Sequence, residues 1–411
     1  MAGSLRRTLT LHIAASTLYE SSQQAALALL PLLARKQFGA GDWGTFLITV
    51  AIPASSLTAV QSEVLLARFG APRFLTILWF AACLPFGLLA LVQEYWGLFA
   101  LYSLGAAGSA GWYPFKGRLF KQLYMDGVRG KALAVVNIGT QIGLAGWLLG
   151  LGFWLDRDPD AFRIYFPLVT VAQLAGLLLF ARLAPHEPPA AAPAALGWRA
   201  LVQPFVEMRT TLVRDPLFAR YQVAFMTYGI GYMVCEALLP ILADKKLHMS
   251  YGELAGTTRV VWQFAIVLMA LPMGWLLDRL GPARTTAGSF AWFALYPLFL
   301  MLAETSAGVA LASVFFGMAM AGIQQGWMLG PVMLAPSADK VSQYVAIHTA
   351  LVGFRGLAFQ FLGMLIYTTT GSFAAPLTIA ALALLAASAQ MALLAPRIDR
   401  PRRVAPADGD G

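Results

Sequence analysis

Long hydrophobic stretches recur along the whole chain, and short polar segments separate them. Each stretch is apolar on all sides rather than along one stripe, which is the pattern of helices that face lipid. A helix needs about 20 apolar residues to cross a membrane. The pattern predicts twelve membrane-spanning helices: Leu9–Leu33, Trp43–Leu66, Phe74–Val92, Leu98–Phe120, Ala132–Leu155, Tyr165–Leu183, Tyr221–Ala243, Leu254–Leu277, Thr285–Leu302, Gly308–Leu334, Tyr344–Tyr367 and Phe373–Leu394.

The basic residues are distributed unevenly between the two sides that these helices define. If the N-terminus lies inside, 21 of the 29 Lys and Arg residues fall in inner segments, 6 fall in outer segments, and Arg259 and Arg355 fall within spans. An excess of positive charge marks the cytoplasmic side of a membrane protein. We therefore expect a multi-pass cell-membrane protein with both termini in the cytoplasm. The short loops are typical of a bacterial inner membrane.

The composition excludes several classes of protein. Hydrophobic residues make up 59% of the 411 residues and charged residues only 12%, about half of the roughly 25% usual in soluble domains. No water-soluble core absorbs so much apolar side chain. Membrane orientation explains the net charge of +9, so we expect no nucleic-acid partner. Cys83 and Cys235 both lie in hydrophobic stretches, which argues against a disulfide framework.

A long polar segment, Ala184–Arg220, divides the hydrophobic stretches into two sets of six. It opens with a Pro-rich stretch that is typical of a linker. Four apolar residues then recur at helical spacing, as in a helix at the membrane surface: Leu201, Phe205, Met208 and Leu212. The predicted domains are an N-terminal six-helix bundle over 1–183, a cytoplasmic linker with an interfacial helix or a plain solvated linker over 184–220, a C-terminal six-helix bundle over 221–395, and a cytoplasmic tail over 396–411.

The two sets of hydrophobic stretches resemble each other in sequence. Ala28–Phe38 reads ALLPLLARKQF and Ala237–Leu247 reads ALLPILADKKL, so seven of eleven positions are identical at an offset of 209. Further on, Ala67–Arg73 reads ARFGAPR and Asp278–Arg284 reads DRLGPAR, at an offset of 211. Two matches in the same order predict an internal duplication of six helices. Such a parallel repeat is typical of transporters in which two halves move around a central site.

The segment Gly274–Arg284, which reads GWLLDRLGPAR, resembles the signature G-x-x-x-D-R-x-G-x-x-R of the major facilitator superfamily. The resemblance extends over the whole chain through its two sets of six spans and its long central loop. It implies an all-α integral membrane protein with 12 transmembrane helices in two pseudo-symmetric six-helix bundles. It also implies that this loop is a conformational latch, in which Asp278 meets arginines and the N-terminus of another helix.

The copy of the signature in the first half departs from the pattern. Ala67 stands where the aspartate is expected, and Glu63 stands at the leading glycine. Glu63 either substitutes partly for the missing aspartate or lies at the headgroup level with no part in a latch. The residues that the resemblance assigns to the latch are Glu63, Arg68, Arg73, Gly274, Asp278, Arg279, Gly281 and Arg284.

Polar and charged residues inside the first predicted span are candidates for the substrate or proton path. A charge inside a bilayer is unfavourable by at least about 2.5–3.5 kcal/mol, so it needs a functional reason. Four polar residues share one helix face by their spacing: Ser16, Glu20, Gln23 and Gln24. Glu20 lies about 18 Å from the inner end, near the midplane, where a protonatable carboxylate can couple proton movement to transport. Polar packing within the bundle is the alternative.

The seventh and eighth spans carry a second set of such residues. Tyr228, Tyr232 and Glu236 form a stripe at helical spacing in the seventh span. Arg259 in the eighth span lies at a depth similar to that of Glu236, so the two charges can pair as a structural salt bridge or an outer gate. Lys116 is expected to extend toward the lipid headgroups of the inner leaflet.

Arg355 lies near the midplane of the eleventh span, with His348 two turns earlier on the same face. An arginine at this depth needs an anion, a carboxylate or carbonyl groups around it. It either holds an anionic group of the substrate or pairs with Glu20 or Glu236. The candidate residues for the substrate and proton cavity are Glu20, Gln23, Gln24, Tyr228, Tyr232, Glu236, Arg259, His348 and Arg355.

The sequence favours a gradient-driven carrier over an enzyme. No H-E-x-x-H motif and no G-x-x-x-x-G-K-[ST] loop occur, so we expect no catalytic residue, metal or cofactor. The predicted function is secondary active transport of a small molecule across the lipid bilayer, with proton coupling as one way to drive it. We expect the protein to act as a monomer. Export is slightly favoured over uptake. Two positions nevertheless depart from the motifs of drug exporters: Leu144 stands where those proteins have a proline, and the arginine that they have before Gly105 is missing. The alternative is a non-transporting assembly or scaffold factor with the same fold.

Overall fold

The computed structural model describes residues 2–184, 198–337 and 340–399. The described part consists of helices and connecting turns, with no strand. The backbone alone is described at residues 2–4, 58–65, 67–68, 113–114, 121, 126–131, 133–134, 198–204, 342 and 346.

Helices follow one another with short connections through the first half of the chain. Three of them contain short π-helical or 3-10 segments that continue the same rod, so one hydrophobic stretch can span several named elements. These elements are α1 (Ala2–Ser16), η1 (Thr17–Ser21), α2 (Ser22–Phe38), α3 (Asp42–Ser55), η2 (Ser56–Thr58), α4 (Ala59–Leu78), η3 (Trp79–Cys83), α5 (Leu84–Leu88), η4 (Leu89–Leu91), α6 (Tyr95–Ser109), α7 (Trp112–Leu123), α8 (Asp126–Arg157) and α9 (Phe162–Leu183).

The second half has the same character and begins with an additional helix, α10. Its elements are α10 (Trp198–Arg214), α11 (Pro216–Lys245), α12 (Tyr251–Ala255), η5 (Gly256–Val260), α13 (Val261–Leu280), α14 (Pro282–Phe293), α15 (Leu295–Leu302), α16 (Ser306–Leu334), α17 (Val341–Thr370) and α18 (Ala374–Ile398).

Nine helices of the described residues are long and apolar enough to cross a membrane. Three predicted spans are helical over most of their length but are not among the nine: Leu9–Leu33, Trp43–Leu66 and Leu98–Phe120. The last of them is divided by a turn between α6 and α7, which leaves pieces of 15 and 12 residues. The first carries the polar residues of η1 and α2, which lower its hydropathy. The count of twelve therefore stays a prediction.

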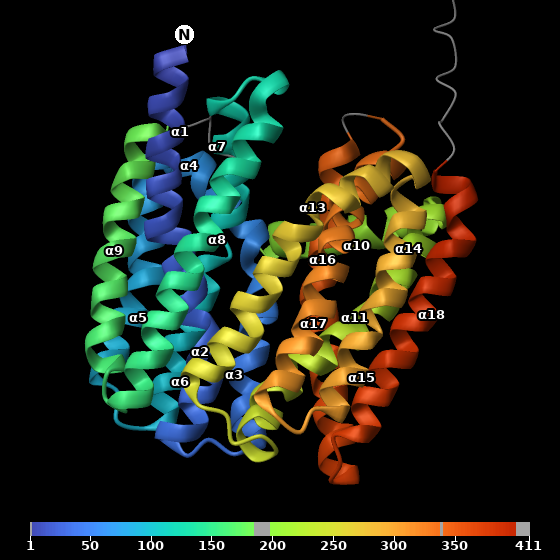
Figure 1. Cartoon of the computed structure of the whole chain (residues 1–411). Coiled ribbons are helices and arrows are strands. Elements are labelled where there is room, and N and C mark those ends of the chain that lie inside the picture. Colours follow the sequence, from blue (N-terminus) through green and yellow to red (C-terminus); the bar gives the residue numbers. More distant parts are fainter. Residues whose placement is uncertain (1, 185–197, 338–339, 400–411) are drawn as a thin grey trace, which may run out of the picture.

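The helices are arranged in two groups that follow the two halves of the sequence (Figure 1). Within the first group α9 packs on α1 and α8 packs on η1; within the second, α18 packs on both α11 and α14. The groups meet where α3 packs on α17 and where the end of α8 packs on α12. In Figure 1 the ribbons of the two groups come together at the lower end and diverge toward the end that carries the N-terminus. The exact domain bounds stay a prediction.

Backbone conformation supports the internal repeat. Left-handed conformations occur at Gly39 (φ 61°) and His248 (φ 48°), which are equivalent at the offset of 209. They occur again at Gly70 (φ 71°) and Gly281 (φ 86°), which are equivalent at the offset of 211. Glycine adopts positive φ without the steric penalty of a Cβ atom, so three of these four positions have the residue that the conformation favours. Both copies of the duplicated motifs thus turn in the same way.

The linker between the halves contains a helix, as its apolar spacing predicted. In α10, Met208 and Leu212 pack against the hydrophobic core. Asp215 then caps α11, since its carboxylate accepts a hydrogen bond from the backbone of Phe218 at 3.0 Å, and it also accepts one from the hydroxyl of Tyr344 at 2.9 Å. The predicted Pro-rich stretch lies mostly outside the described residues. The position of α10 at a membrane surface stays a prediction.

Candidate functional site

Glu20 forms an ion pair with Lys116 inside the first group of helices. The carboxylate lies on the π-helical segment η1, and the ammonium group reaches it from α7, with Nζ and Oε2 at 2.5 Å. The exposed fractions are 4% for the Glu20 side chain and 17% for that of Lys116. The prediction that Lys116 extends to the headgroups is therefore wrong. Single π-helical turns within α-helices are frequent at functional sites.

The polar face of the first rod is used mainly for contacts within the bundle. The amide of Gln23 donates a hydrogen bond to Ser109 in α6 at 3.0 Å and accepts one from Gln173 in α9 at 2.5 Å. Gln24 is half-buried, and Ser16 is fully buried. Gln23 thus links α2, α6 and α9 by hydrogen bonds, which agrees with the alternative that this polar face serves packing within the bundle. A part for Gln23 and Gln24 in a substrate or proton cavity stays a prediction.

Glu236 and Arg259 lie together near the end of α11. Their closest oxygen and nitrogen are 3.6 Å apart, so the pairing of charges that the sequence indicated is observed. Arg259 lies on the π-helical segment η5, and its guanidinium carbon is 4.0 Å from the ring centroid of Trp262. The exposed fractions are 20% for Glu236 and 31% for Arg259. This pair is therefore more accessible than the pair of Glu20 with Lys116.

Arg355 lies in α17 with no carboxylate within 4 Å among the described residues. Its Nη1 donates to the backbone oxygen of Phe225 at 3.3 Å, and its guanidinium carbon lies 5.4 Å from the ring centroid of Tyr228. The residue is 5% exposed, and its Nε has no hydrogen-bond partner in the described part of the chain. The predicted alternative of a pair with Glu20 or Glu236 is wrong in this structure, since those carboxylates bind other cations.

The helix opposite Arg355 is shaped to admit its side chain. A Cβ atom built on Gly229 of α11 would lie 2.6 Å from Cδ of Arg355. Glycine at this position therefore lets the long side chain lie directly against the helix backbone. Tyr228, the neighbouring residue, stacks its ring on that of Tyr232 at 6.0 Å and an angle of 12°. Phe290 covers the ring of Tyr228 at 4.7 Å.

His348 lies two turns before Arg355 on the same helix and forms a second polar contact with α11. Its Nδ1 is 2.8 Å from Oε1 of Gln222. The other ring nitrogen of His348 and the amide nitrogen of Gln222 are buried without a hydrogen-bond partner in the described residues. Trp327 of α16, which is half-buried, borders the imidazole at a centroid distance of 5.2 Å. We call Gln222, His348 and Arg355 the cationic cluster.

A network of charges joins the two groups of helices at the end where their ribbons converge. Arg35 binds Asp42 at 3.0 Å and Asp244 at 2.9 Å, and Lys245 binds the other oxygen of Asp42 at 2.7 Å. Arg35 and Asp244 occupy equivalent positions of the internal repeat, 209 residues apart. The two copies of the repeat have opposite charges at this position, which is the signal in the sequence for the contact. The contact itself was not predicted. We call these four residues the closing cluster.

Asp156 adds a second connection at the same end of the molecule. Its carboxylate accepts hydrogen bonds from the hydroxyl of Ser250 at 2.9 Å and from the backbone of Tyr251 at 2.7 Å and Gly252 at 2.9 Å. These groups form the N-terminus of the rod made by α12, η5 and α13, where a negative charge is favoured. Gly152 allows the close approach of the two helices, since a Cβ there would lie 2.9 Å from Gly252.

The residues assigned to the latch are only partly engaged. Arg279 stacks on the ring of Trp275 at 4.2 Å. The N-terminus of α14 binds Asp399 rather than Asp278, through the backbone of Ala283 at 2.8 Å and of Arg284 at 3.1 Å. Gly274 and Gly281 lie in and directly after α13, and Arg73 is exposed. The side chains of Glu63 and Arg68 lie outside the described residues. The latch therefore stays a prediction.

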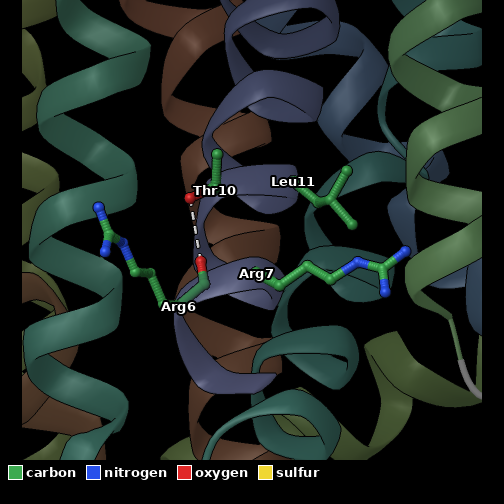
Figure 2. Close-up of a pocket in the computed structure, with 4 residues that line it drawn as sticks. All are labelled: Arg6, Arg7, Thr10 and Leu11. Atoms are coloured by element: carbon green, nitrogen blue, oxygen red, sulfur yellow. Dashed lines mark hydrogen bonds between the residues drawn. The ribbon is translucent and has the colours of Figure 1, made fainter. Parts of the chain in front are cut away.

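A shallow depression of about 380 Å³ lies at the start of α1 (Figure 2). It is lined by Arg6, Arg7, Thr10 and Leu11, all from one helix. Figure 2 shows the two arginine side chains pointing to opposite sides of that helix. Both residues are exposed, so the depression does not concentrate charge around a ligand.

Comparison with solved structures identifies the fold. A peptide transporter POT in complex with sulfate matches at a TM-score of 0.77 and 15% identity, over 96% of this chain and 95% of that one. The chain has the major facilitator fold. The nucleoside transporter NupG matches at a TM-score of 0.68 and 14% identity, over 95% of this chain and 98% of that one. No protein-family model and no curated protein matches the sequence.

A third structure with the major facilitator fold is described as inward-facing and unoccupied. It is a bacterial homolog of the human lysosomal transporter Spinster and matches at a TM-score of 0.67 and 16% identity, over 98% of this chain and 99% of that one. The resemblance that the loop Gly274–Arg284 indicated thus holds for the fold of the whole chain. At this level of identity, residue roles do not transfer from these proteins, and the chemistry has to be argued from the side chains described above.

Proposed function

We propose that this protein is a secondary active transporter that carries a small solute across a membrane by alternating access. The observation that carries this proposal is the closing cluster. It joins the two halves at one end, and it does so between equivalent positions of an internal repeat. Two ion pairs between the halves, Arg35 with Asp244 and Lys245 with Asp42, lie at this end. Two bundles that contact each other at one end can move relative to each other so that this end opens while the other end closes.

The conformation is proposed to be open toward the cytoplasm. The ribbons diverge at the end that carries the N-terminus (Figure 1), and the distribution of basic residues predicts that this end is cytoplasmic. The Spinster homolog, which has the same fold, is described as inward-facing. In this conformation the closing cluster and Asp156 seal the outer side.

Proton coupling through Glu20 is the second part of the proposal. Its carboxylate is buried and pairs with Lys116 from another helix of the same half. Protonation of Glu20 would neutralise the carboxylate and release the ammonium group. A buried ammonium without a partner is strongly unfavourable, so the helices that carry the pair would have to rearrange. This gives a physical link between proton binding and the arrangement of η1 and α7.

Alternating access can be tested without knowing the substrate. The only cysteines of the chain, Cys83 and Cys235, are buried and can be replaced by alanine before spin labels are introduced. A labelled pair at Gln93→Cys and Glu304→Cys, both exposed in loops of the closed end, reports on that end. A second pair at Met125→Cys and Met333→Cys, both exposed, reports on the opposite end.

Electron–electron distances are then measured in lipid nanodiscs between pH 5.5 and pH 8. A transporter is expected to show two populations for each pair, and the change at one end should be opposite in sign to the change at the other. A single unchanged distance at both ends across this range would contradict the proposal and favour a static scaffold. Flux of a labelled solute panel into proteoliposomes, with and without a pH gradient, then identifies the direction and the coupling ion.

A further inference from the structure

Lys116, Arg259 and Arg355 are cations within the helices of the membrane region, and Arg355 differs from the other two in having no opposite charge beside it among the described residues. Lys116 binds Glu20 and Arg259 binds Glu236. Arg355 has no carboxylate within 4 Å among the described residues. A buried charge is normally paired, because the protein interior solvates it poorly. In each of the two ion pairs, the positive and negative charges cancel. Among the described residues, nothing cancels the positive charge of Arg355 in the cationic cluster.

The contacts of Arg355 leave most of its hydrogen-bonding capacity unused. A guanidinium group has five N–H donors. The structure gives it one carbonyl acceptor, Phe225, at the long distance of 3.3 Å, and one ring face, Tyr228, at 5.4 Å. Its Nε is buried without a partner. Planar arginine donors match carboxylate oxygens in a bidentate arrangement, and such charge-assisted bonds are about twice as strong as neutral ones.

The rest of the cationic cluster offers neutral hydrogen-bonding groups next to that charge. Gln222 and His348 contact each other and leave one nitrogen each without a partner. His348 lies seven residues from Arg355, which corresponds to about 10 Å along the helix. Gln222 lies one turn before Phe225 on α11. A ligand that binds Arg355 can therefore reach a neutral polar group of the same cluster.

The walls of the cluster are aromatic. Tyr228 lies beside Arg355, and Tyr221 lies 5.8 Å from the ring of His348. The ring of Trp327 lies 5.2 Å from that of His348, and Trp327 is half-buried. Ligand sites are mostly apolar with a few polar groups that fix orientation. Aromatic walls favour an organic anion over a small inorganic one.

We propose that the cationic cluster between α11 and α17 binds organic monoanions, with a carboxylate against Arg355 and the apolar or ring-bearing part against Tyr228 and Trp327. This rests on the proposed transport function and names the substrate class for it. One uncompensated charge is neutralised by one carboxylate. A dianion would leave a net negative charge in a buried site, and a neutral isostere would leave the guanidinium unpaired.

The test compares carboxylates with primary amides of the same shape. Purified protein in nanodiscs is titrated calorimetrically with benzoate, phenylacetate and indole-3-acetate, with their three amides and with the dianion phthalate. At least one monocarboxylate is expected to bind, and its amide and the dianion should bind at least about 30-fold more weakly. Equal binding of a carboxylate and its amide, or the absence of binding by all three carboxylates, would overturn the proposal.

Substitution of the arginine locates the site. Arg355→Gln should weaken carboxylate binding at least about 30-fold, and Arg355→Lys should retain part of it because the charge remains without the planar fork. Arg182→Gln, which removes an exposed arginine at the end of α9, is the matched control and should bind as the wild type does. Undiminished binding by Arg355→Gln would overturn the assignment. If that variant does not fold, Arg355→Lys and the carboxylate–amide comparison still decide.

The outcomes separate this inference from the proposed function. Binding at equilibrium does not require transport, so carboxylates that bind through Arg355 but never cross the membrane would support the site and contradict the carrier. Conversely, gradient-driven flux of a neutral or cationic solute that is unaffected by Arg355→Gln would support the carrier and overturn the anion site.

Discussion

At the residue scale, the sequence identified the buried charges but could not identify their partners. Glu20, Glu236, Arg259 and Arg355 stand out because charged residues are rare in apolar stretches. The position of Lys116 near the inner end of its predicted span favours a place at the membrane surface. It pairs instead with a carboxylate 96 residues away. Which helix faces which is fixed by tertiary packing, and a single sequence contains little information about that.

The pair of Glu20 and Lys116 predicts a stability effect that depends on the partner. Glu20→Gln leaves a mostly buried ammonium group unpaired, and we expect the free energy of unfolding to fall by about 3 kcal/mol. The double variant Glu20→Gln with Lys116→Met should recover most of this loss, because no charge then stays buried. Thermal unfolding in nanodiscs measures both variants. Glu94→Gln, at an exposed loop position, is the control. A double variant no more stable than Glu20→Gln would argue against the pair.

The same substitution predicts a loss of proton coupling. In proteoliposomes with an imposed pH gradient, Glu20→Gln should abolish uptake against a concentration gradient, while exchange of the solute across the membrane at equal pH continues. The measurement compares gradient-driven uptake with counterflow in the same variant. Unchanged accumulation by Glu20→Gln would show that the coupling proton binds elsewhere.

Gly229 predicts a packing effect at the cationic cluster. Gly229→Ala places a Cβ atom 2.6 Å from Cδ of Arg355, so the arginine or the helix must move. We expect a loss of about 1–3 kcal/mol in unfolding free energy, as in other overpacked interiors. Gly146→Ala, at a helical position with no atom within 4 Å, should be neutral or stabilising, because alanine favours helix more than glycine does. Equal stability of the two variants would contradict the close contact.

At the element scale, the helices and the duplication were largely predictable, whereas their ends and local distortions were not. The hydrophobic stretches are long enough to identify the helices, and the matching turns at Gly39 and His248 follow the repeat. The π-helical segments η1 and η5, which carry Glu20 and Arg259, have no sequence signal that we recognised. The turn between α6 and α7 was also missed. Such features arise from packing against neighbouring helices rather than from local propensity.

The N-terminus of α14 predicts an effect at the scale of one helix. Asp399 accepts hydrogen bonds from two backbone amides there and contacts Gly281, the residue with φ 86°. Asp399→Ala should lower the unfolding free energy by about 0.5–2 kcal/mol, which is usual for the loss of a helix cap. Hydrogen exchange should become faster in the first turn of α14. Asp158→Ala, an exposed carboxylate at the end of α8, is the control. No change in exchange at Ala283 and Arg284 would contradict the capping role.

At the scale of the whole molecule, the closing cluster shows how a duplicated sequence acquires a specific interface. The repeat places residues 35 and 244 at the same position of each half, and a pseudo-twofold arrangement brings such positions close together. Identical charges there would repel each other. Arg35 and Asp244 instead have opposite charges and lie 2.9 Å apart. The two halves have therefore diverged where they meet, and their divergence stabilises one closed end.

This interface predicts a shift between the two conformations. Asp244→Asn removes one of the two carboxylates that bind Arg35, which is itself only 5% exposed, while the rest of each bundle is unchanged. We expect the population that is open at this end to rise about 5- to 150-fold, the range for a coupling of 1–3 kcal/mol. Distances between spin labels at Gln93→Cys and Glu304→Cys measure it. Asp160→Asn is the matched control, because Asp160 is exposed and pairs with Arg163 of its own half. If Asp244→Asn leaves the distances unchanged, the pair of Arg35 with Asp244 does not hold this end closed.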